Sequence, residues 1–569
     1  MAANETLLQA FEWHSTSHSP SMNKGYSTES HYTYLRRVLP SLARIGVTGI
    51  WLPPGCKANN SQGNGYDCYD LWDLGEYDQK GGRATKWGVK EELSKVMQTA
   101  EGEGIQCIWD TVLNHKAGGD ATEETWAVEV DEEDRRIEIC SPKKIEAWLR
   151  FDFPGRERDG VSNEKFLWRA EHFNGTDWDH RAQKRAIYKI IDDPFTLSNP
   201  SLRPDIWNDF MWMKNSGTKA RTERRAGKGW AEDVDDQHGN ADYLMFSNID
   251  YSQSSVQDHV KHWGEWMVND VGVDGFRLDA AQHFSYSFTR DWISVVQQAS
   301  WKKRNRELFI VGEIWTDEPR CILDWLNSVG QNAYAYDSPL LYNFSRISED
   351  IRKGSKSVDL RTILHDSLLE LRPQSAVTFV TNHDTQPGQT SYAPIDSQLK
   401  SFFYAFILLR REGRPCVFWG DLYGTNGPYA EPPACTVRTA NGGERNLLPD
   451  LIMVRKYLAY GEQKDYFDST HCIGFTRSGV EGESKTGCAI IISVANKDTS
   501  TGDYRATKRM RIGKPGEVWV DILCEKEYRT ETIIDAKGYG LFSCGGMGIG
   551  VFSRRAEADQ FSLNLNLDS

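Results

Sequence analysis

An arginine and an aspartate stand two residues apart in the apolar stretch GVDGFRLDAAQH at 272–283. In a β-strand, Arg277 and Asp279 share one face, and the apolar residues beside them share the other. If helices cover both faces of the sheet, this ion pair is removed from bulk water at considerable cost. A lone pair of this kind is most often a structural salt bridge, so a catalytic role requires partners from elsewhere in the chain.

Candidate partners stand at the ends of other apolar runs of the chain. Two carboxyls in different environments can act as a proton donor and as a negative charge beside a developing cation. The pattern therefore permits acid–base chemistry if the fold brings these segments together. The partners are Asp110, Asn114 and His115 at the end of one run, Glu313 at the end of a second, and His383 and Asp384 at the end of a third.

The segments that carry these residues alternate with helical patterns, such as those at 32–46, 90–104 and 397–413, which close on glycine. Strands alternating with helices indicate a parallel sheet, and eight repeats indicate a closed (β/α)8 TIM barrel. In such a barrel the active site lies at the C-terminal ends of the strands, where these polar residues stand. The strand-like runs are 7–13, 47–53, 105–113, 273–279, 308–315, 333–337, 376–384 and 415–421.

Two segments fall outside this alternation. Residues 115–244 are acidic, rich in tryptophan and irregular, which predicts a domain inserted after the third strand. Residues 461–556 contain short apolar runs separated by glycine and charged turns, which predicts a C-terminal all-β sandwich domain. The catalytic barrel then comprises residues 1–114 and 245–460, and the polar tail at 557–569 is expected to fray.

The composition indicates a large globular protein that does not bind polyanions. The 569 residues are 39% hydrophobic, and the net charge is −14 with no long basic tract. These values disfavour nucleic acid or an anionic membrane as a partner, and a neutral or small polar substrate fits better. No apolar stretch approaches the roughly 20 residues of a membrane helix. Eleven scattered cysteines and an N-terminus without a secretory pattern favour a cytoplasmic protein, which we expect to be a monomer.

Four motifs, in this order, carry a resemblance to a known family. DTVLNH (110–115), GFRLDAAQH (275–283), GEIW (312–315) and VTNHD (380–384) resemble the four sequence regions of the α-amylase family of glycoside hydrolases. Segments 65–88 and 241–250 are similar to those of bacterial liquefying-type α-amylases and their fungal intracellular relatives. The resemblance implies endo-acting, retaining hydrolysis of α-1,4-glucosidic bonds in starch, glycogen and malto-oligosaccharides.

In terms of this family, three carboxylates divide the chemistry of acetal cleavage. Asp279 is expected to be the nucleophile, Glu313 the general acid and base, and Asp384 the carboxylate that grips sugar hydroxyls. Arg277 is then a fixed cation that keeps Asp279 ionised and oriented, and Asp110 is expected to hold Arg277. Crowding by the two aspartates is expected to raise the pKa of Glu313.

The resemblance also implies residues that bind the sugar. His115 and His383 match the family's histidines that hydrogen-bond sugar hydroxyls, and Tyr66 matches the aromatic platform beneath the cleaved unit. Trp315 and Trp13 are candidates for neighbouring subsites, and core packing is an equally good interpretation for each of these tryptophans.

A calcium ion is implied at the junction of the barrel and the inserted segment. Asn248 and Ala231 stand where bacterial relatives carry aspartates, so we expect weaker calcium binding and no second metal ion. Gln282 stands where the family usually has lysine, which affects how the leaving-group side of the cleft binds glucan. The expected calcium ligands are oxygen atoms of Asn114, Asp242 and Asn248 and the backbone carbonyl of His283.

Two other functions remain open from the sequence. A 4-α-glucanotransferase of the same fold would form the same covalent intermediate and pass it to a sugar rather than to water. A non-catalytic glucan-binding protein on the same barrel is the second alternative. The presence of all three carboxylates disfavours this second alternative.

Overall fold

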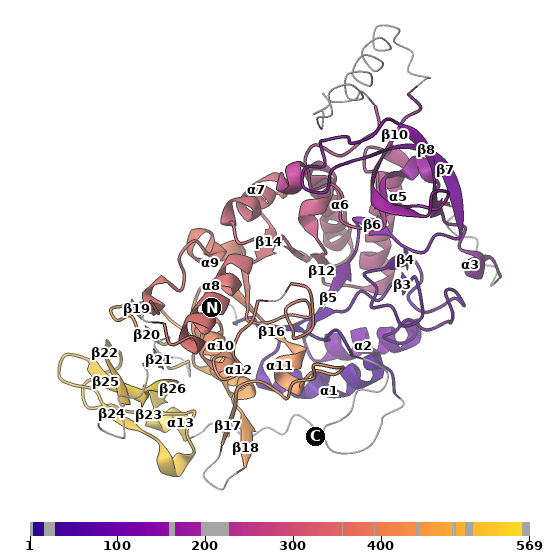
Figure 1. Cartoon of the computed structure of the whole chain (residues 1–569). Helices are drawn as coiled ribbons and strands as arrows, with labels where there is room; N and C mark the ends of the chain where they lie inside the picture. Colours follow the sequence, from indigo (N-terminus) through magenta and orange to yellow (C-terminus); the bar gives the residue numbers. More distant parts are fainter. Residues whose placement is uncertain are drawn as a thin grey trace.

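The computed structural model describes most of the chain, with its strands gathered in a central barrel and in two outer regions (Figure 1). The described residues are 4–15, 29–158, 166–194, 227–355, 357–391, 393–438, 443–480, 482, 485–495 and 505–559. Within these ranges, no helix is both long enough and apolar enough to cross a membrane.

Eight parallel strands close into the barrel in the order β1, β2, β5, β12, β13, β14, β15 and β16. Seven of the strands lie within predicted runs and β16 begins one residue before its run, so the predicted (β/α)8 barrel is confirmed. All four residues of β12 are buried, which is typical of a parallel strand covered on both faces. The bounds are β1 (Leu7–Gln9), β2 (Gly49–Leu52), β5 (Gln106–Thr111), β12 (Gly275–Leu278), β13 (Phe309–Gly312), β14 (Ala333–Tyr336), β15 (Ala376–Phe379) and β16 (Arg414–Phe418).

Helices follow most of the barrel strands. The side chain of Ser30 accepts a hydrogen bond from the backbone N–H of Thr33 and so caps the start of α1. Helix α10 ends at Leu409, earlier than predicted, because Arg410 is extended and leads the chain into β16. The helices are α1 (His31–Ile45), α2 (Lys90–Gly102), α5 (Ser254–Trp266), α6 (Tyr286–Arg304), α7 (Pro319–Val329), α8 (Ser338–Arg352), α9 (Leu368–Leu371), α10 (Lys400–Leu409), α11 (Trp419–Tyr423) and α12 (Leu448–Tyr457).

A six-stranded antiparallel sheet has the order β6, β11, β9, β10, β7 and β8 (Figure 1, upper right). Five of its strands lie in the inserted segment, and β11 follows directly after it. The expectation of an irregular insertion is therefore wrong for its described part. Strand β8 has the sequence KKIEAWLR, in which charged residues interrupt the apolar ones that face inward. Parts of the predicted insertion, 159–165 and 195–226, lie outside the described residues. The bounds are β6 (His115–Lys116), β7 (Ala121–Glu129), β8 (Lys143–Arg150), α3 (Pro154–Arg158), β9 (Phe173–Asp179), β10 (Lys184–Ile191) and β11 (Ser247–Ile249).

The C-terminal region contains two sheets, as predicted (yellow in Figure 1). One sheet has the order β19, β20, β21, β26, β23 and β24, and β22 pairs with β25 in the other. A core that includes Met510, Trp519 and Phe542 lies between them. Of the predicted tail, residues 560–569 lie outside the described part. The bounds are β19 (Gln463–Tyr466), β20 (Cys472–Arg477), β21 (Cys488–Val494), β22 (Arg505–Arg511), β23 (Val518–Asp521), β24 (Glu531–Ile533), β25 (Tyr539–Gly545), β26 (Met547–Arg554) and α13 (Arg555–Ala558).

Two further strand pairs lie in the described part of the chain: β3 (Lys57–Ala58) with β4 (Cys68–Asp70), and β17 (Thr436–Arg438) with β18 (Glu444–Asn446). All eleven cysteines of the chain are among the described residues, and each is a free thiol. Burial raises the pKa of the Cys107 and Cys416 thiols to about 12, so these side chains behave as apolar core residues.

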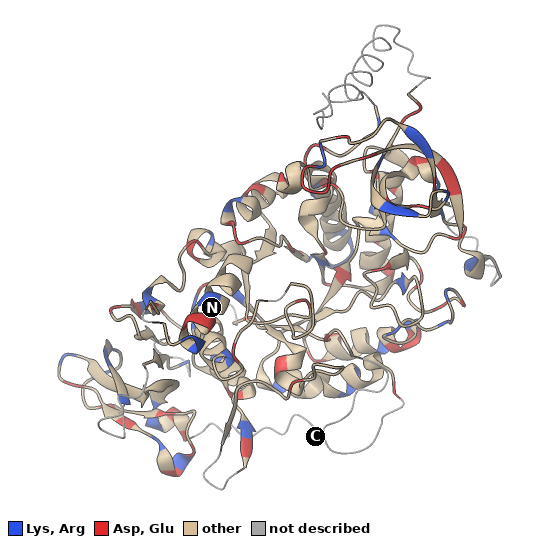
Figure 2. Cartoon of the chain, in the orientation of Figure 1, with Lys and Arg blue, Asp and Glu red and all other residues tan. Residues whose placement is uncertain are grey.

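Charges of both signs lie next to one another on the inserted sheet (Figure 2). Lys144 pairs with Glu124 at 2.6 Å across β7 and β8, and Lys184 pairs with Glu129 at 2.6 Å. Such exposed pairs contribute little to stability. They do keep the outer face of this sheet from presenting a single sign of charge.

Candidate active site

Arg277 lies at the centre of a buried group of carboxylates. Strand β12 sits between β5 and β13, and its register places Arg277 opposite Asp110 of β5. Nη1 of Arg277 donates to Asp110 Oδ1 at 2.8 Å and to Asp279 Oδ1 at 2.5 Å. Nη2 forms an ion pair with Glu313 Oε1 at 2.6 Å. The barrel thus brings together Arg277 and the carboxylates that follow or lie on three neighbouring strands, as the sequence predicts.

The charges of this group do not balance. One guanidinium faces three carboxyls, and burial raises the pKa of Asp110 to about 7. Burial is also the main cause of the raised pKa of Glu313, which Asp279 raises further and Arg277 opposes. The sequence-based reason, crowding by two aspartates, is therefore secondary. A Glu313 carboxyl that keeps its proton can act as a general acid.

Asp384 approaches the same group from the end of β15. Burial raises its pKa well above the ordinary value, with the charge of Glu313 as the next cause. Its side chain is nevertheless 28% exposed, whereas those of Asp279 and Glu313 are 11% and 10% exposed. Asp384 is therefore the most accessible of the three carboxyls to a ligand.

The imidazole of His383 is held in one protonation state. Burial lowers its pKa well below the ordinary value, so the ring is neutral. The side-chain amide of Gln9 on β1 donates to Nδ1 at 2.8 Å, which leaves the proton on Nε2. Nε2 lies 3.2 Å from Asp384 Oδ2. His383 therefore presents an N–H beside the exposed carboxylate.

Three rings with nearly parallel planes line this part of the site. Tyr66 and His383 are stacked, with centroids 5.1 Å apart and an interplanar angle of 1°. The half-buried Trp13 lies parallel to both, at 6.1 Å from Tyr66 and 5.9 Å from His383. This favours a subsite role over core packing for Trp13. Trp315 lies elsewhere, against Tyr342 at 6.2 Å.

Both ends of Tyr66 are fixed. Its hydroxyl donates to Asp110 Oδ2 at 2.8 Å, and its backbone carbonyl accepts a hydrogen bond from Nε2 of His115 at 2.8 Å. The predicted ring platform and one of the two predicted histidines are therefore directly connected. In this structure His115 orients Tyr66.

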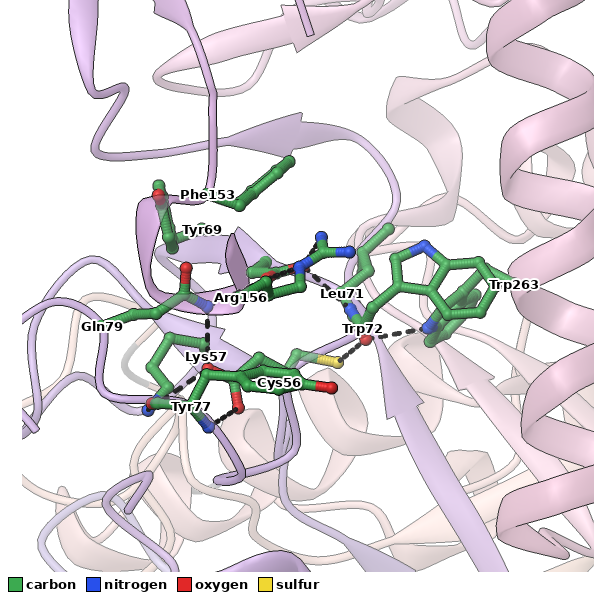
Figure 3. A network of polar contacts seen from close by, with 12 residues as sticks. Cys56, Lys57, Tyr69, Leu71, Trp72, Tyr77, Gln79, Phe153, Arg156 and Trp263 are labelled. Carbon is green, nitrogen blue, oxygen red and sulfur yellow. Dashed lines mark hydrogen bonds and ion pairs between the residues drawn. The ribbon is translucent and has the colours of Figure 1, made fainter. Parts of the chain in front are cut away.

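A buried polar network fixes the hairpin whose connection carries Tyr66 (Figure 3). The ammonium of Lys57 on β3 donates to three backbone carbonyls of the segment 77–83. On β4, Asp70 accepts two hydrogen bonds from Arg156 of α3, at 2.6 and 2.7 Å. Because α3 belongs to the insertion, these contacts hold the Tyr66 loop against both the barrel and the inserted segment.

The residues expected to bind calcium come together between the barrel and the inserted sheet. The side-chain amide of Asn114 lies 2.6 Å from the His283 carbonyl and 3.0 Å from Asn248 Oδ1. Asp242, from the end of the insertion, contacts Asn248 through its carbonyl, and burial raises the pKa of its carboxyl to about 8. In the described part of the chain, no three His, Cys, Asp or Glu side chains form a potential metal site. The cluster consists of amide and carbonyl groups with one carboxyl.

The ring of His115 contacts both Tyr66 and Asn114. Its Nε2 contacts a carbonyl, which can only accept, so the proton is on Nε2. Burial lowers the pKa of His115 to about 4, so the ring is neutral. Nδ1 lies 3.1 Å from Asn114 Oδ1.

The contacts of this cluster run through the nitrogen of the Asn114 amide, which donates to the His283 carbonyl and to Asn248 Oδ1. Side-chain amide oxygens, backbone carbonyls and the carboxyl of Asp242 are hard oxygen ligands of the kind that Ca²⁺ prefers. The residues present therefore fit calcium.

Two residues that orient these groups are not predicted from the sequence. Gln9 fixes the tautomer of His383, and the only signal is a polar residue inside an apolar strand run. Asn174 on β9 accepts from Asn248 Nδ2 at 2.8 Å and donates to Asp242 Oδ2 at 2.7 Å. No motif marks Asn174, because its partners come from distant parts of the chain.

Comparison with known proteins agrees with this geometry. The family model described as alpha amylase, catalytic domain, matches residues 35–445. The chain is 35% identical over 555 residues to an alpha-amylase of Bacillus licheniformis, covering 97% of this chain and 94% of that protein. It is 32% identical over 567 residues to the cytoplasmic alpha-amylase of Escherichia coli strain K12, covering 96% and 98% of the two chains.

The solved structures show the same fold. The alpha-amylase of Geobacillus thermoleovorans complexed with acarbose matches with a TM-score of 0.53 at 15% identity, over 97% of this chain and 98% of that one. The family model and the relatives above 30% identity agree with the barrel and with the cluster of carboxyls around Arg277. The chain therefore belongs to the alpha-amylase family and is a glycoside hydrolase.

Proposed function

We propose that this chain hydrolyses internal α-1,4-glucosidic bonds of starch, glycogen and malto-oligosaccharides with retention of anomeric configuration. The observation that carries the proposal is the buried Arg277, which contacts the carboxyls of both Asp279 and Glu313. A shared cation of this kind holds the two carboxyls near one another. Retention requires them to be roughly 5 to 5.5 Å apart.

In the first step, Asp279 attacks the anomeric carbon while Glu313 gives its proton to the glycosidic oxygen. The carbon–oxygen bond breaks, the leaving glucan departs with that proton, and a glycosyl ester of Asp279 forms. In the second step, Glu313 takes a proton from water, the water oxygen attacks the same carbon, and Asp279 leaves. Two inversions at that carbon give an α-anomeric product.

The groups around the carboxyls bind the sugar. Asp384 and the N–H of His383 are proposed to hold hydroxyls of the cleaved unit, and Tyr66 to cover its apolar face. His115 supports Tyr66 in this proposal and contributes to the same subsite. Trp315 is proposed to contact a neighbouring glucose unit, since it is half-buried and follows Glu313 by two residues.

We also propose that the protein binds Ca²⁺ through Asn114, Asp242, Asn248 and the carbonyl of His283. The ion supplies a positive charge that joins the end of β5 to the inserted segment. Asn248 and Ala231 contribute no carboxylate, so we expect weaker retention than in relatives with aspartates at these positions. The proposed ligand set contains a single carboxylate, that of Asp242.

For the cellular setting, we propose a cytoplasmic monomer whose partner is an α-glucan rather than nucleic acid or a membrane. The Escherichia coli relative is named a cytoplasmic enzyme. The net charge of −14 supports a substrate without negative charge.

Asp279→Asn tests the proposed nucleophile, with Asp291→Asn on the exposed side of α6 as a matched control. The first variant should lose several orders of magnitude of turnover on soluble starch with its fold intact, because an amide cannot form the ester. The control should keep wild-type turnover. A first variant with a tenth of wild-type activity would refute the assignment.

Product analysis tests the rest of the reaction. Proton nuclear magnetic resonance of the first products from maltoheptaose should show the α-anomer, and a β-anomer would mean inversion. Products longer than the substrate, formed in the presence of a labelled acceptor, would instead favour a 4-α-glucanotransferase.

A further inference from the structure

The loop after β16 lies at the end of the barrel that carries the carboxyls, because it follows the C-terminal end of a strand. The loop closes on itself: the backbone N–H of Thr425 donates to the Glu431 carbonyl at 2.9 Å, and the N–H of Glu431 donates to Thr425 Oγ1 at 2.8 Å. Tyr429 stands within it and is 63% exposed. The loop therefore presents a large aromatic side chain to solvent from a defined backbone.

This loop is attached to the segment that carries Trp13. The side chain of Asn426 donates to Glu12 Oε1 at 3.0 Å, and Gly427 lies directly against the ring of His14. Glu12 is fully buried and also accepts a hydrogen bond from Gln386 at 3.2 Å. The position of Tyr429 is thus coupled to the first loop of the site.

Gln386 connects the same group to the ring platform. Its Oε1 accepts a hydrogen bond from the backbone N–H of Trp13 at 3.0 Å. Trp13 in turn lies parallel to Tyr66 and His383. The hydrogen bonds of Glu12 and Gln386 therefore position both the inner aromatic rings and the loop that carries Tyr429.

The ring of Tyr429 rests on Gly388. A Cβ atom at Gly388 would lie 2.4 Å from Cδ2 of this ring, and the φ angle of Gly388 is +88°, so glycine is required both for space and for backbone conformation. Gly388 follows Asp384 by four residues, which limits their Cα atoms to roughly 14 Å apart. Tyr429 therefore lies within a few sugar units of the carboxyls.

We propose that Tyr429 is an outer glucan-binding residue that stacks on a glucose unit of long substrates beyond the units held by Trp13 and Tyr66. A flat, exposed ring with one side supported by backbone matches the apolar C–H face of a pyranose. The proposal rests on the proposed function, because it assumes that the carboxyl end of the barrel binds α-glucan. In this proposal, Tyr429 favours the binding of long substrates and takes no part in bond cleavage.

The test compares long and short substrates. Tyr429→Ala should lower kcat/KM for maltoheptaose by about three- to tenfold and leave kcat/KM for a chromogenic maltotrioside unchanged. Tyr429→Phe keeps the ring and should match the wild type on both. Tyr528→Ala is the matched control, since Tyr528 is also 63% exposed but lies in the C-terminal region.

The outcomes separate this proposal from the proposed function. Equal loss on both substrates by Tyr429→Ala, or no loss on maltoheptaose, would overturn the outer binding residue while the enzyme still cleaves glucan. A loss of the same size with Tyr528→Ala would also overturn it. Absence of cleavage of either substrate by the wild type would instead refute the proposed function. Unchanged melting temperatures of the variants exclude misfolding as the cause.

Discussion

Replacing Asn248 by aspartate should destabilise the metal-free protein and increase the stabilisation that calcium provides. In the metal-free protein, Nδ2 of Asn248 donates to Asn174 Oδ1 at 2.8 Å and to the Asp242 carbonyl. An aspartate side chain cannot donate a hydrogen bond, so Asn174 Oδ1 and the Asp242 carbonyl lose their donor. The substitution also adds a second carboxyl to the cluster. A buried acceptor left without a hydrogen bond costs about 1–3 kcal/mol. The metal-free variant should therefore unfold at a lower temperature than the wild type.

With calcium present, the loss should be smaller. The new carboxylate joins that of Asp242 and raises the number of carboxylates in the cluster from one to two. A tenfold gain in affinity corresponds to about 1.4 kcal/mol, and saturating calcium stabilises the folded state by the same additional amount. The calcium-dependent rise in melting temperature should therefore be larger for Asn248→Asp than for the wild type.

The assay is thermal unfolding in excess chelator and at stepwise calcium concentrations, with metal analysis of the purified protein. Asn327→Asp, an exposed position on α7, controls for the added charge and should behave like the wild type in both conditions. A calcium-dependent rise in melting temperature no larger than that of the wild type would refute the role of Asn248 in the cluster. Identical wild-type curves with chelator and with calcium, together with no bound calcium, would refute the calcium site.

Three further predictions concern the cluster of carboxyls around Arg277. Because the pKa of Glu313 is raised, kcat/KM should fall as the pH rises through that pKa. Glu313→Gln should lack this fall at alkaline pH when the substrate is a maltosyl fluoride, because the fluoride leaving group needs no proton. Burial raises the pKa of Asp384, so its contribution to stability is full below the unfolded value of about 3.9 and is lost as the pH rises through the folded value. Asp384→Asn should therefore raise the melting temperature more at pH 8 than at pH 5, and equal shifts would contradict this cause. Arg277→Lys keeps one charge but cannot contact Asp110, Asp279 and Glu313 together, so turnover on starch should fall at least about 100-fold. Turnover near that of the wild type would show that the several donors of the guanidinium are unnecessary.

The barrel and its carboxyls could be predicted because local pattern and position agree. Strands β12 and β13 are short, fully buried runs, and each ends directly before a carboxylate, Asp279 or Glu313. A parallel barrel brings such strand ends to one place whatever their separation in sequence. Once the alternation of strands and helices is recognised, the catalytic residues at the strand ends can therefore be predicted from the sequence.

The inserted sheet and the supporting contacts could not be predicted in the same way. Strands such as β7 and β8 carry charges on a solvent face, which hides their alternation among acidic residues. His383 is 374 residues from Gln9, and Asn248 and Asp242 are 74 and 68 residues from Asn174, so only the tertiary structure brings these partners within hydrogen-bond distance. The size of the contribution of burial to the pKa of Glu313 likewise depends on the packing around it.

Mass spectrometry can detect the proposed covalent bond between Asp279 and the sugar. Incubation with a maltosyl fluoride that carries a second, rate-slowing fluorine on the sugar ring should trap the intermediate. After proteolysis, we expect a single glycosylated peptide that contains Asp279, modified at that carboxyl. A glycosylated Glu313 peptide, or turnover of the reagent with no labelled peptide and a β-anomeric product, would contradict it.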